Sequence, residues 1–133
     1  MAQRVNPYTV APQGVAALVG VENYLQACGL DHKLIALVKM RVSQINGCAY
    51  CLHMHSMEAR KLGEMEARLY LLDAWHESKL YSERERAALA WAEALTHIAA
   101  SRAPDDVYDA ARRQFSASSF AIISASFGSL ASS

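Results

Sequence analysis

Apolar residues recur at helical spacing along nearly the whole chain, and this pattern constrains the fold more than any other feature of the sequence. It is clearest over residues 31–46, where apolar side chains form a wide face and the charged residues fall mostly outside it. No stretch alternates apolar and polar residues, and no hairpin turn stands between β-branched runs. We therefore expect an all-α fold. The apolar face consists of Leu34, Ile35, Leu37, Val38, Val42 and Ile45, and the charged residues are Lys33, Lys39 and Arg41.

Helix start and stop signals divide this pattern into about six to seven helices. Asp31 is placed to cap the second helix, and Asn46 and Gly47 end it, because both residues accept the left-handed conformation common at helix ends. Ser82 and Glu85 form a capping box before the fifth helix. The predicted helices span 12–28, 31–46, 48–62, 64–75, 83–100, 104–114 and a tail rich in serine and alanine, 116–133.

Length and charge limit the domain organisation and the partners. The chain of 133 residues has the size of one domain, 1–133, and a single core can close at that length. Its formal net charge is zero, so we expect no nucleic-acid partner and no anionic membrane, since both need a basic excess. No apolar run approaches the roughly 20 residues of a membrane span, and the N-terminus lacks the apolar middle of a secretory signal, so the expected compartment is the cytoplasm.

The stretch over residues 41–56 concentrates the reactive side chains, with two of the chain's three cysteines and two of its five histidines. Cys48 and Cys51 form a C-x-x-C pair, and in a helix His55 lies on the face of Cys51, one turn away. The first turn of a helix favours a thiolate, and a second cysteine within reach lets a sulfenic acid condense to a disulfide. These residues favour a thiol peroxidase or a thiol–disulfide oxidoreductase, in which His55 holds or moves the proton.

Two other interpretations of the cysteine pair stay open. In the first, Cys48, Cys51 and His55 bind zinc, with Cys28 and His53 or His32 available for the fourth position, although no second ligand cluster is present. In the second, the two cysteines are a buried pair without chemistry.

The sequence of residues 41–51, RVSQINGCAYC, continued by Leu52-His53-Met54-His55, resembles the core motif of the alkylhydroperoxidase D (AhpD) branch of the carboxymuconolactone decarboxylase family. The resemblance extends to Pro12 and residues 29–31 on one side and to residues 75–96 on the other. It implies an all-helical AhpD-like domain that assembles as a homo-oligomer, often a trimer or a hexamer.

The resemblance also implies an activity. Proteins of this branch reduce hydroperoxides with the cysteine pair, and a dithiol donor such as a lipoyl or thioredoxin-like protein reduces the pair again. By position, Cys51 resembles the cysteine that attacks the peroxide, Cys48 the cysteine that resolves it, and His55 the histidine of the proton relay. The resemblance implies neither a cofactor nor a metal. The decarboxylase branch lacks the cysteine pair, which argues against lactone decarboxylation.

The chain departs from the family pattern at the relay. The position that the family often fills with glutamate is Ala36 here, and alanine cannot accept a proton. His32, Glu22, and Lys39 or Met40 are the candidates to replace that carboxylate, and Tyr50, between the cysteines, is a candidate to line the peroxide entrance. The alternative function is a redox-sensing or small-molecule-binding oligomer of the same fold that keeps the pair without efficient turnover.

Overall fold

The structure is a computed structural model that describes residues 4–128, and residues 127 and 128 without their side chains. Within this range it holds nine α-helices, a short 3-10 helix and no strand, so the predicted all-α fold is confirmed. The elements are α1 (Pro7–Val10), α2 (Pro12–Ala27), α3 (His32–Asn46), α4 (Ala49–Lys61), α5 (Glu66–Tyr70), η1 (Leu72–Ala74), α6 (Glu83–Thr96), α7 (Ile98–Ser101), α8 (Asp105–Gln114) and α9 (Ala117–Gly128).

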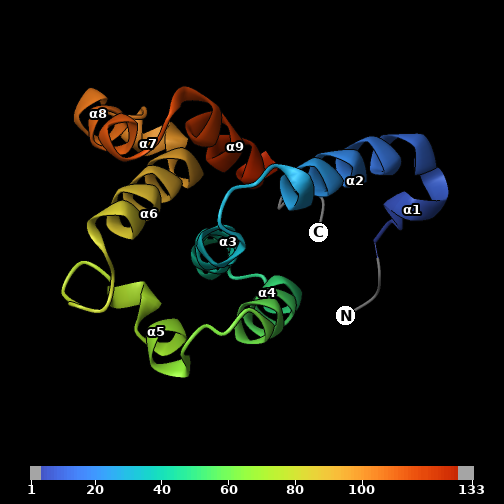
Figure 1. Cartoon of the computed structure of the whole chain (residues 1–133). Coiled ribbons are helices and arrows are strands. Elements are labelled where there is room, and N and C mark those ends of the chain that lie inside the picture. The colour runs from blue at the N-terminus through green and yellow to red at the C-terminus, as the bar shows by residue number, and fades with distance from the viewer. Residues whose placement is uncertain (1–3, 129–133) are drawn as a thin grey trace.

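Helix α3 lies at the centre of the molecule, between two groups of helices (Figure 1). On one side it packs with α2, α6, α8 and α9 around a core that includes Leu34, Val38 and Trp91. On the other side it packs with α4, α5, η1 and α6 around a second core that includes Leu37, Leu72 and Leu89. Because α3 takes part in both cores, its apolar face is wide, as its sequence predicts.

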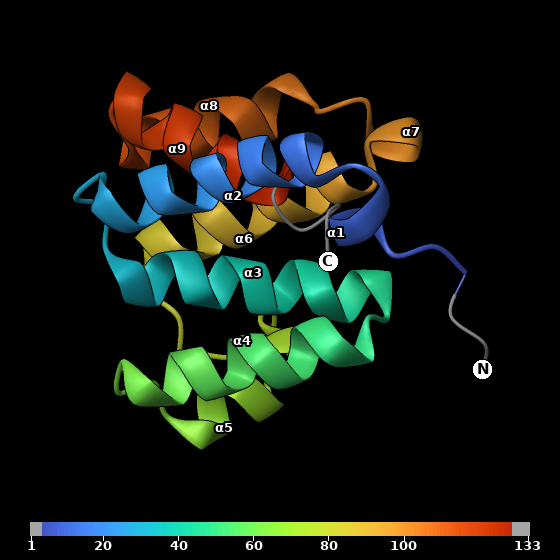
Figure 2. The same ribbon diagram turned by 90° about the vertical axis from the view of Figure 1, so that its right-hand side faces the viewer.

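The antiparallel pair of α3 and α4 is visible in Figure 2, where the two helices lie side by side. Their connection is the short turn at Gly47, which adopts the left-handed conformation with φ of 63°. Asp31 caps α3, with its Oδ1 accepting from the Lys33 amide at 2.9 Å. Both helix ends follow the sequence prediction.

Two predicted helices are divided in the structure. The helix expected over 64–75 is interrupted at Leu71, which separates α5 from η1, and the helix expected over 83–100 ends at Thr96, after which α7 forms a separate turn. Helix α1 was not predicted. The region of the first interruption is also held by contacts with residues distant in sequence, described next. The end of the predicted tail helix, residues 129–133, lies outside the described residues.

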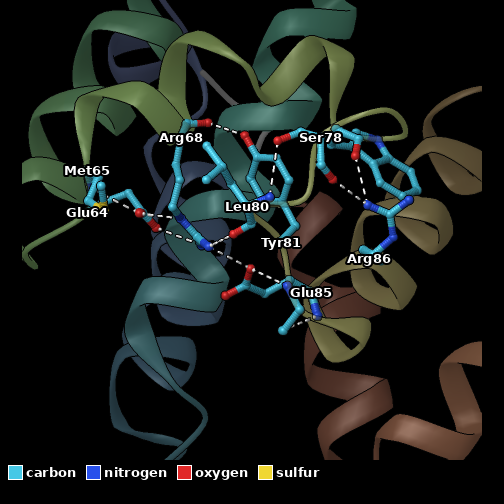
Figure 3. Close-up of polar contacts among 10 residues, drawn as sticks. Glu64, Met65, Arg68, Ser78, Leu80, Tyr81, Glu85 and Arg86 are labelled. Atoms are coloured by element: carbon cyan, nitrogen blue, oxygen red, sulfur yellow. Dashed lines mark hydrogen bonds and ion pairs between the residues drawn. The ribbon is translucent and has the colours of Figure 1, made fainter.

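Arg68 holds the region between α5 and α6 (Figure 3). Its Nε donates to Oε1 of the buried Glu64 at 2.7 Å, and its Nη1 donates to the Leu80 carbonyl at 2.6 Å and pairs with Glu85 at 3.0 Å. The Tyr81 hydroxyl donates to the Arg68 carbonyl. Burial raises the pKa of Tyr81, and the nearby Arg68 offsets only part of that shift. This network joins α5 and the following loop to the start of α6.

Arg86 fixes the same loop from α6 (Figure 3). Its guanidinium donates to the carbonyls of Trp75 and Ser78, each at 2.9 Å, and to that of His76 at 2.8 Å. Three backbone carbonyls of this loop are thereby hydrogen-bonded to one side chain of α6. Ser82 and Glu85 form the predicted capping box at the start of α6.

The prediction that Lys39 and Arg41 lie outside is wrong. Lys39 is 3% exposed, and its Nζ contacts the two carboxylate oxygens of Glu22 on α2 at 2.8 and 2.6 Å. Arg41 donates to Glu93 of α6 at 2.9 Å and pairs with Asp73 at 2.6 Å. Lys39 is buried, and its carboxylate partner offsets the cost of removing the charge from water, whereas Arg41 is only partly buried and Asp73 is exposed.

Candidate active site

The turn between α3 and α4 places the cysteine pair at the start of a helix. After Gly47, Cys48 takes an extended conformation and is the N-cap of α4. Its sulfur accepts from the Cys51 amide at 3.2 Å, so one of the N–H groups that a helix start leaves without a partner is satisfied. The partial positive charge of this helix end lies beside both sulfurs, where it favours a thiolate.

Cys48 and Cys51 are joined by a disulfide in the structure, and their Cα atoms lie 5.3 Å apart. The two residues differ in exposure: Cys51 is 3% exposed, whereas Cys48 is only partly buried. Cys48 is therefore the sulfur of the pair that is more open to solvent. The remaining cysteine, Cys28, is free, and its sulfur contacts the Leu25 carbonyl at 3.1 Å.

His55 lies one helical turn after Cys51 and is buried, with 3% of its surface exposed. Its Nδ1 is 3.0 Å from Oε2 of Glu58, the residue three positions later on the same helix. Its Nε2 is buried and has no hydrogen-bond partner among the described residues. Glu58 was not among the candidates predicted from the sequence, although its i,i+3 spacing from His55 is the signal that would have identified it.

A cavity of about 330 Å³ lies between α3 and the second half of α4 and is open on one side. Ala36 and Glu58 both line it, so the position where the family often carries glutamate shares the cavity with the carboxylate that contacts His55. The full lining is Gln26, His32, Ile35, Ala36, Lys39, Glu58, Lys61 and Leu62.

The other predicted site residues take different places. His32 lines the cavity, while Glu22 binds Lys39 across the gap between α2 and α3. Tyr50 is 67% exposed, so most of its side chain faces solvent. The structure therefore brings Cys48, Cys51 and His55 together on α4 and places His32 on the cavity wall.

The described residues include no group of three or more His, Cys, Asp or Glu side chains arranged to hold a metal ion. Both sulfurs proposed as zinc ligands take part in the disulfide. This arrangement gives the zinc-site alternative no support. Among the described helices, none combines the length and the apolar character that crossing a membrane requires.

Three comparisons relate the chain to known proteins. The model of the carboxymuconolactone decarboxylase family matches residues 12–94, from α2 to α6. The uncharacterized protein YdfG of Bacillus subtilis (strain 168) is 43% identical over 115 residues, which cover 86% of this chain and 78% of YdfG. The uncharacterized protein YnjA of Escherichia coli (strain K12) is 37% identical over 89 residues, 66% of this chain and 46% of YnjA.

A solved structure has the same fold. It is the crystal structure of ATU0492 from Agrobacterium tumefaciens, a protein of unknown function whose description links it to the antioxidant defence protein AhpD. The TM-score is 0.91 at 40% sequence identity, and the alignment covers 97% of this chain and 88% of that chain. Because the family model spans more than half of the sequence and includes the cysteine pair, this chain belongs to the carboxymuconolactone decarboxylase family.

Proposed function

We propose that this protein reduces hydroperoxides through a cycle in which Cys48 and Cys51 alternate between thiols and a disulfide. The observation that carries the proposal is the cysteine pair at the N-terminus of α4, with the buried His55 one turn below Cys51. This arrangement supplies a nucleophile, a resolving thiol and a group that exchanges a proton.

In the first half of the cycle, Nε2 of His55 takes the proton from the Cys51 thiol. The thiolate attacks the terminal oxygen of the hydroperoxide, so an S–O bond forms and the O–O bond breaks. The leaving alkoxide receives the proton from His55 and departs as an alcohol. Cys51 is oxidised to a sulfenic acid, and the peroxide is reduced by two electrons.

The second half restores the thiols. The Cys48 thiolate attacks the sulfur of the Cys51 sulfenic acid, the S–S bond forms, and hydroxide leaves as water after protonation. A thiolate of a dithiol donor, a lipoyl or thioredoxin-like protein, then attacks Cys48, because this sulfur is the more exposed of the two. Cys51 leaves as the thiolate in the first turn of α4, and the donor is joined to Cys48 by a mixed disulfide. The second thiol of the donor attacks its own sulfur in that bond, so Cys48 leaves as a thiolate and the donor departs as a disulfide.

The cavity beside Glu58 gives the organic part of a hydroperoxide a place to bind. Ile35, Ala36 and Leu62 supply apolar surface there, and Lys39, Lys61 and His32 supply polar groups. The reaction needs no cofactor. The cytoplasm is the compartment we expect, since a dithiol donor keeps the pair reduced there.

A thiol count with single-cysteine variants tests the proposal. The reduced protein is treated with tert-butyl hydroperoxide, and free thiols are titrated before and after. We expect the wild type to lose two thiols, C51S to lose none, and C48S to accumulate a sulfenic acid on Cys51 that dimedone traps. C28S is the matched control and should lose the same two thiols as the wild type.

The alternative function predicts that peroxide is not consumed continuously. If the pair belongs to a redox sensor or a binding module, the wild type forms the disulfide at most once and consumes no peroxide beyond one equivalent, even with dihydrolipoamide present. Sustained peroxide consumption with dihydrolipoamide supports the enzyme, and its absence overturns it.

A further inference from the structure

The carboxylate that the family pattern places on α3 has a counterpart on α4 in this chain. Cys51, His55 and Glu58 occupy positions i, i+4 and i+7 of one helix and therefore share a face. The Glu58 carboxylate meets Nδ1 of His55 at 3.0 Å. At Ala36 a methyl group faces the same cavity, so α3 offers no acceptor there.

The other predicted replacements are less suited to this role. Glu22 is held by Lys39, which contacts both of its carboxylate oxygens. His32 lines the cavity, but the hydrogen-bond partner of Nδ1 of His55 is Glu58. The titratable side chains that face the cavity beside Glu58 are His32 and Lys39 from α3 and Lys61 from α4, and among the lining residues Glu58 alone is a carboxylate.

The contact with Glu58 decides which nitrogen of His55 carries the proton. An ionised carboxylate only accepts hydrogen bonds, so the proton of a neutral imidazole lies on Nδ1. Nε2 is then the acceptor, and it is the ring atom that is buried with no partner among the described residues. A base that has to accept a thiol proton needs this tautomer.

We propose that Glu58 is the positioning residue for His55, holding the imidazole in the Nδ1–H tautomer and stabilising the imidazolium after proton transfer. The role of His55 as the base rests on the proposed function, whereas the tautomer does not. The proposal thus assigns the missing relay carboxylate to α4, three residues after the histidine, in place of the family position at Ala36.

The test measures the tautomer and the rate separately. With the cysteines reduced, long-range ¹H–¹⁵N spectra of the His55 ring should show the Nδ1–H tautomer in the wild type and a mixture in E58A. The rate at which tert-butyl hydroperoxide oxidises Cys51 should fall about 10–100-fold in E58A, by analogy with the loss when a partner that orients a metal-binding histidine is removed. E58Q keeps a hydrogen-bond acceptor without the charge, so its oxidation rate and its share of the Nδ1–H tautomer should lie between those of the wild type and E58A.

Two further variants separate positioning from a general effect on the fold. E58D should recover part of the rate, and A36E/E58A, which places a carboxylate on the opposite wall of the cavity, should recover part of both the rate and the tautomer. E77Q, in the loop before α6, is the matched control and should behave as the wild type. If E58A fails to fold, E58Q provides both readouts.

The outcomes distinguish this inference from the proposed function. An unchanged tautomer and an unchanged rate in E58A and E58Q overturn the positioning role while peroxide reduction stands. A wild type that does not react with peroxide, but whose tautomer changes in E58A, overturns the peroxidase and supports the positioning role. Loss of rate in E58A with an unaltered tautomer also contradicts the proposal.

Discussion

Glu93 is a single residue on which three parts of the fold converge. Its Oε1 accepts from Trp75 Nε1 at 2.8 Å and from Arg41 Nε at 2.9 Å, and its Oε2 lies 3.3 Å from His76 Nε2. Burial by itself raises the pKa of Glu93, but the hydrogen bonds from Trp75, Arg41 and His76 outweigh it, so the pKa lies below its ordinary value of 4.5. The ionised carboxylate therefore stabilises the folded state.

This lowered pKa predicts how stability depends on pH. The contribution of Glu93 is complete above pH 4.5, its ordinary pKa, and is lost as the pH falls through the lower pKa of the folded state. We expect E93Q to reduce the free energy of unfolding at pH 7 by about 1.5–3 kcal/mol, the usual contribution of hydrogen bonds to a charged group. Urea denaturation at pH 7, 5 and 3.5 should show the gap between E93Q and the wild type closing at the lowest pH. A stability gap of the same size at all three pH values would show that the charge of Glu93 is not involved. E77Q is the control and should be as stable as the wild type at each pH.

Residues close together on one helix were the ones that the sequence identified best. Cys48, Cys51 and His55 lie within two turns of α4, so their spacing alone predicted their common face. The contact of Glu58 with His55 is just as local, but the family pattern places the relay carboxylate on α3, at Ala36, and gives no sign of one on α4. The burial of Lys39 was unpredictable from local pattern, because its partner Glu22 lies on α2, 17 positions away.

At the scale of elements, the sequence predicts helix ends that are capped by nearby residues, but not helix breaks in regions held by distant contacts. Helices α3, α4 and α6 begin or end at residues whose own side chain or backbone satisfies the terminal groups, and the sequence places these ends within a residue or two. The division between α5 and η1 lies instead in a region that Arg68 joins to the loop before α6 and to the start of α6. The sequence pattern of residues 64–75 does not indicate those contacts.

The pairing of Arg68 with Glu64 predicts a large loss of stability when the arginine alone is removed. Glu64 is 2% exposed, so R68M leaves a buried carboxylate without its cation and should cost about 3–5 kcal/mol. The double variant E64Q/R68M removes the charge as well and should recover part of this loss. Urea denaturation of the four proteins in this cycle measures both effects. A double variant less stable than R68M would mean that Glu64 is not the group left unsatisfied.

At the scale of the whole molecule, α2 has the fewest buried residues among the described helices of twelve or more residues. It has 16 residues, yet Leu25 is its one buried residue. Leu18, Val19 and Tyr24 are 38%, 45% and 59% exposed, and Tyr8 of the preceding α1 is 64% exposed. A periodic pattern predicts that a helix forms, but it does not say whether the same chain or another copy buries its apolar residues.

We expect other copies of the chain to cover this surface in a trimer or hexamer, as family membership suggests. Light scattering after size exclusion should give the mass of that oligomer for the wild type. V19E, which adds a charge to the exposed apolar surface, should shift the mass toward the monomer without loss of helical circular dichroism. Q13E adds the same charge at a polar, exposed position of α2 and is the matched control. A wild type that is monomeric at micromolar concentration contradicts the expectation.

The ion pair between Lys39 and Glu22 has a consequence for enzyme assays. Helix α2 provides Glu22 to this pair and Gln26 to the wall of the cavity, and the same helix carries the exposed apolar residues. Substrate pocket and subunit contact would thus share one helix, and separating the subunits would loosen a wall of the pocket. Turnover per chain should then decline on dilution, at concentrations where the oligomer dissociates.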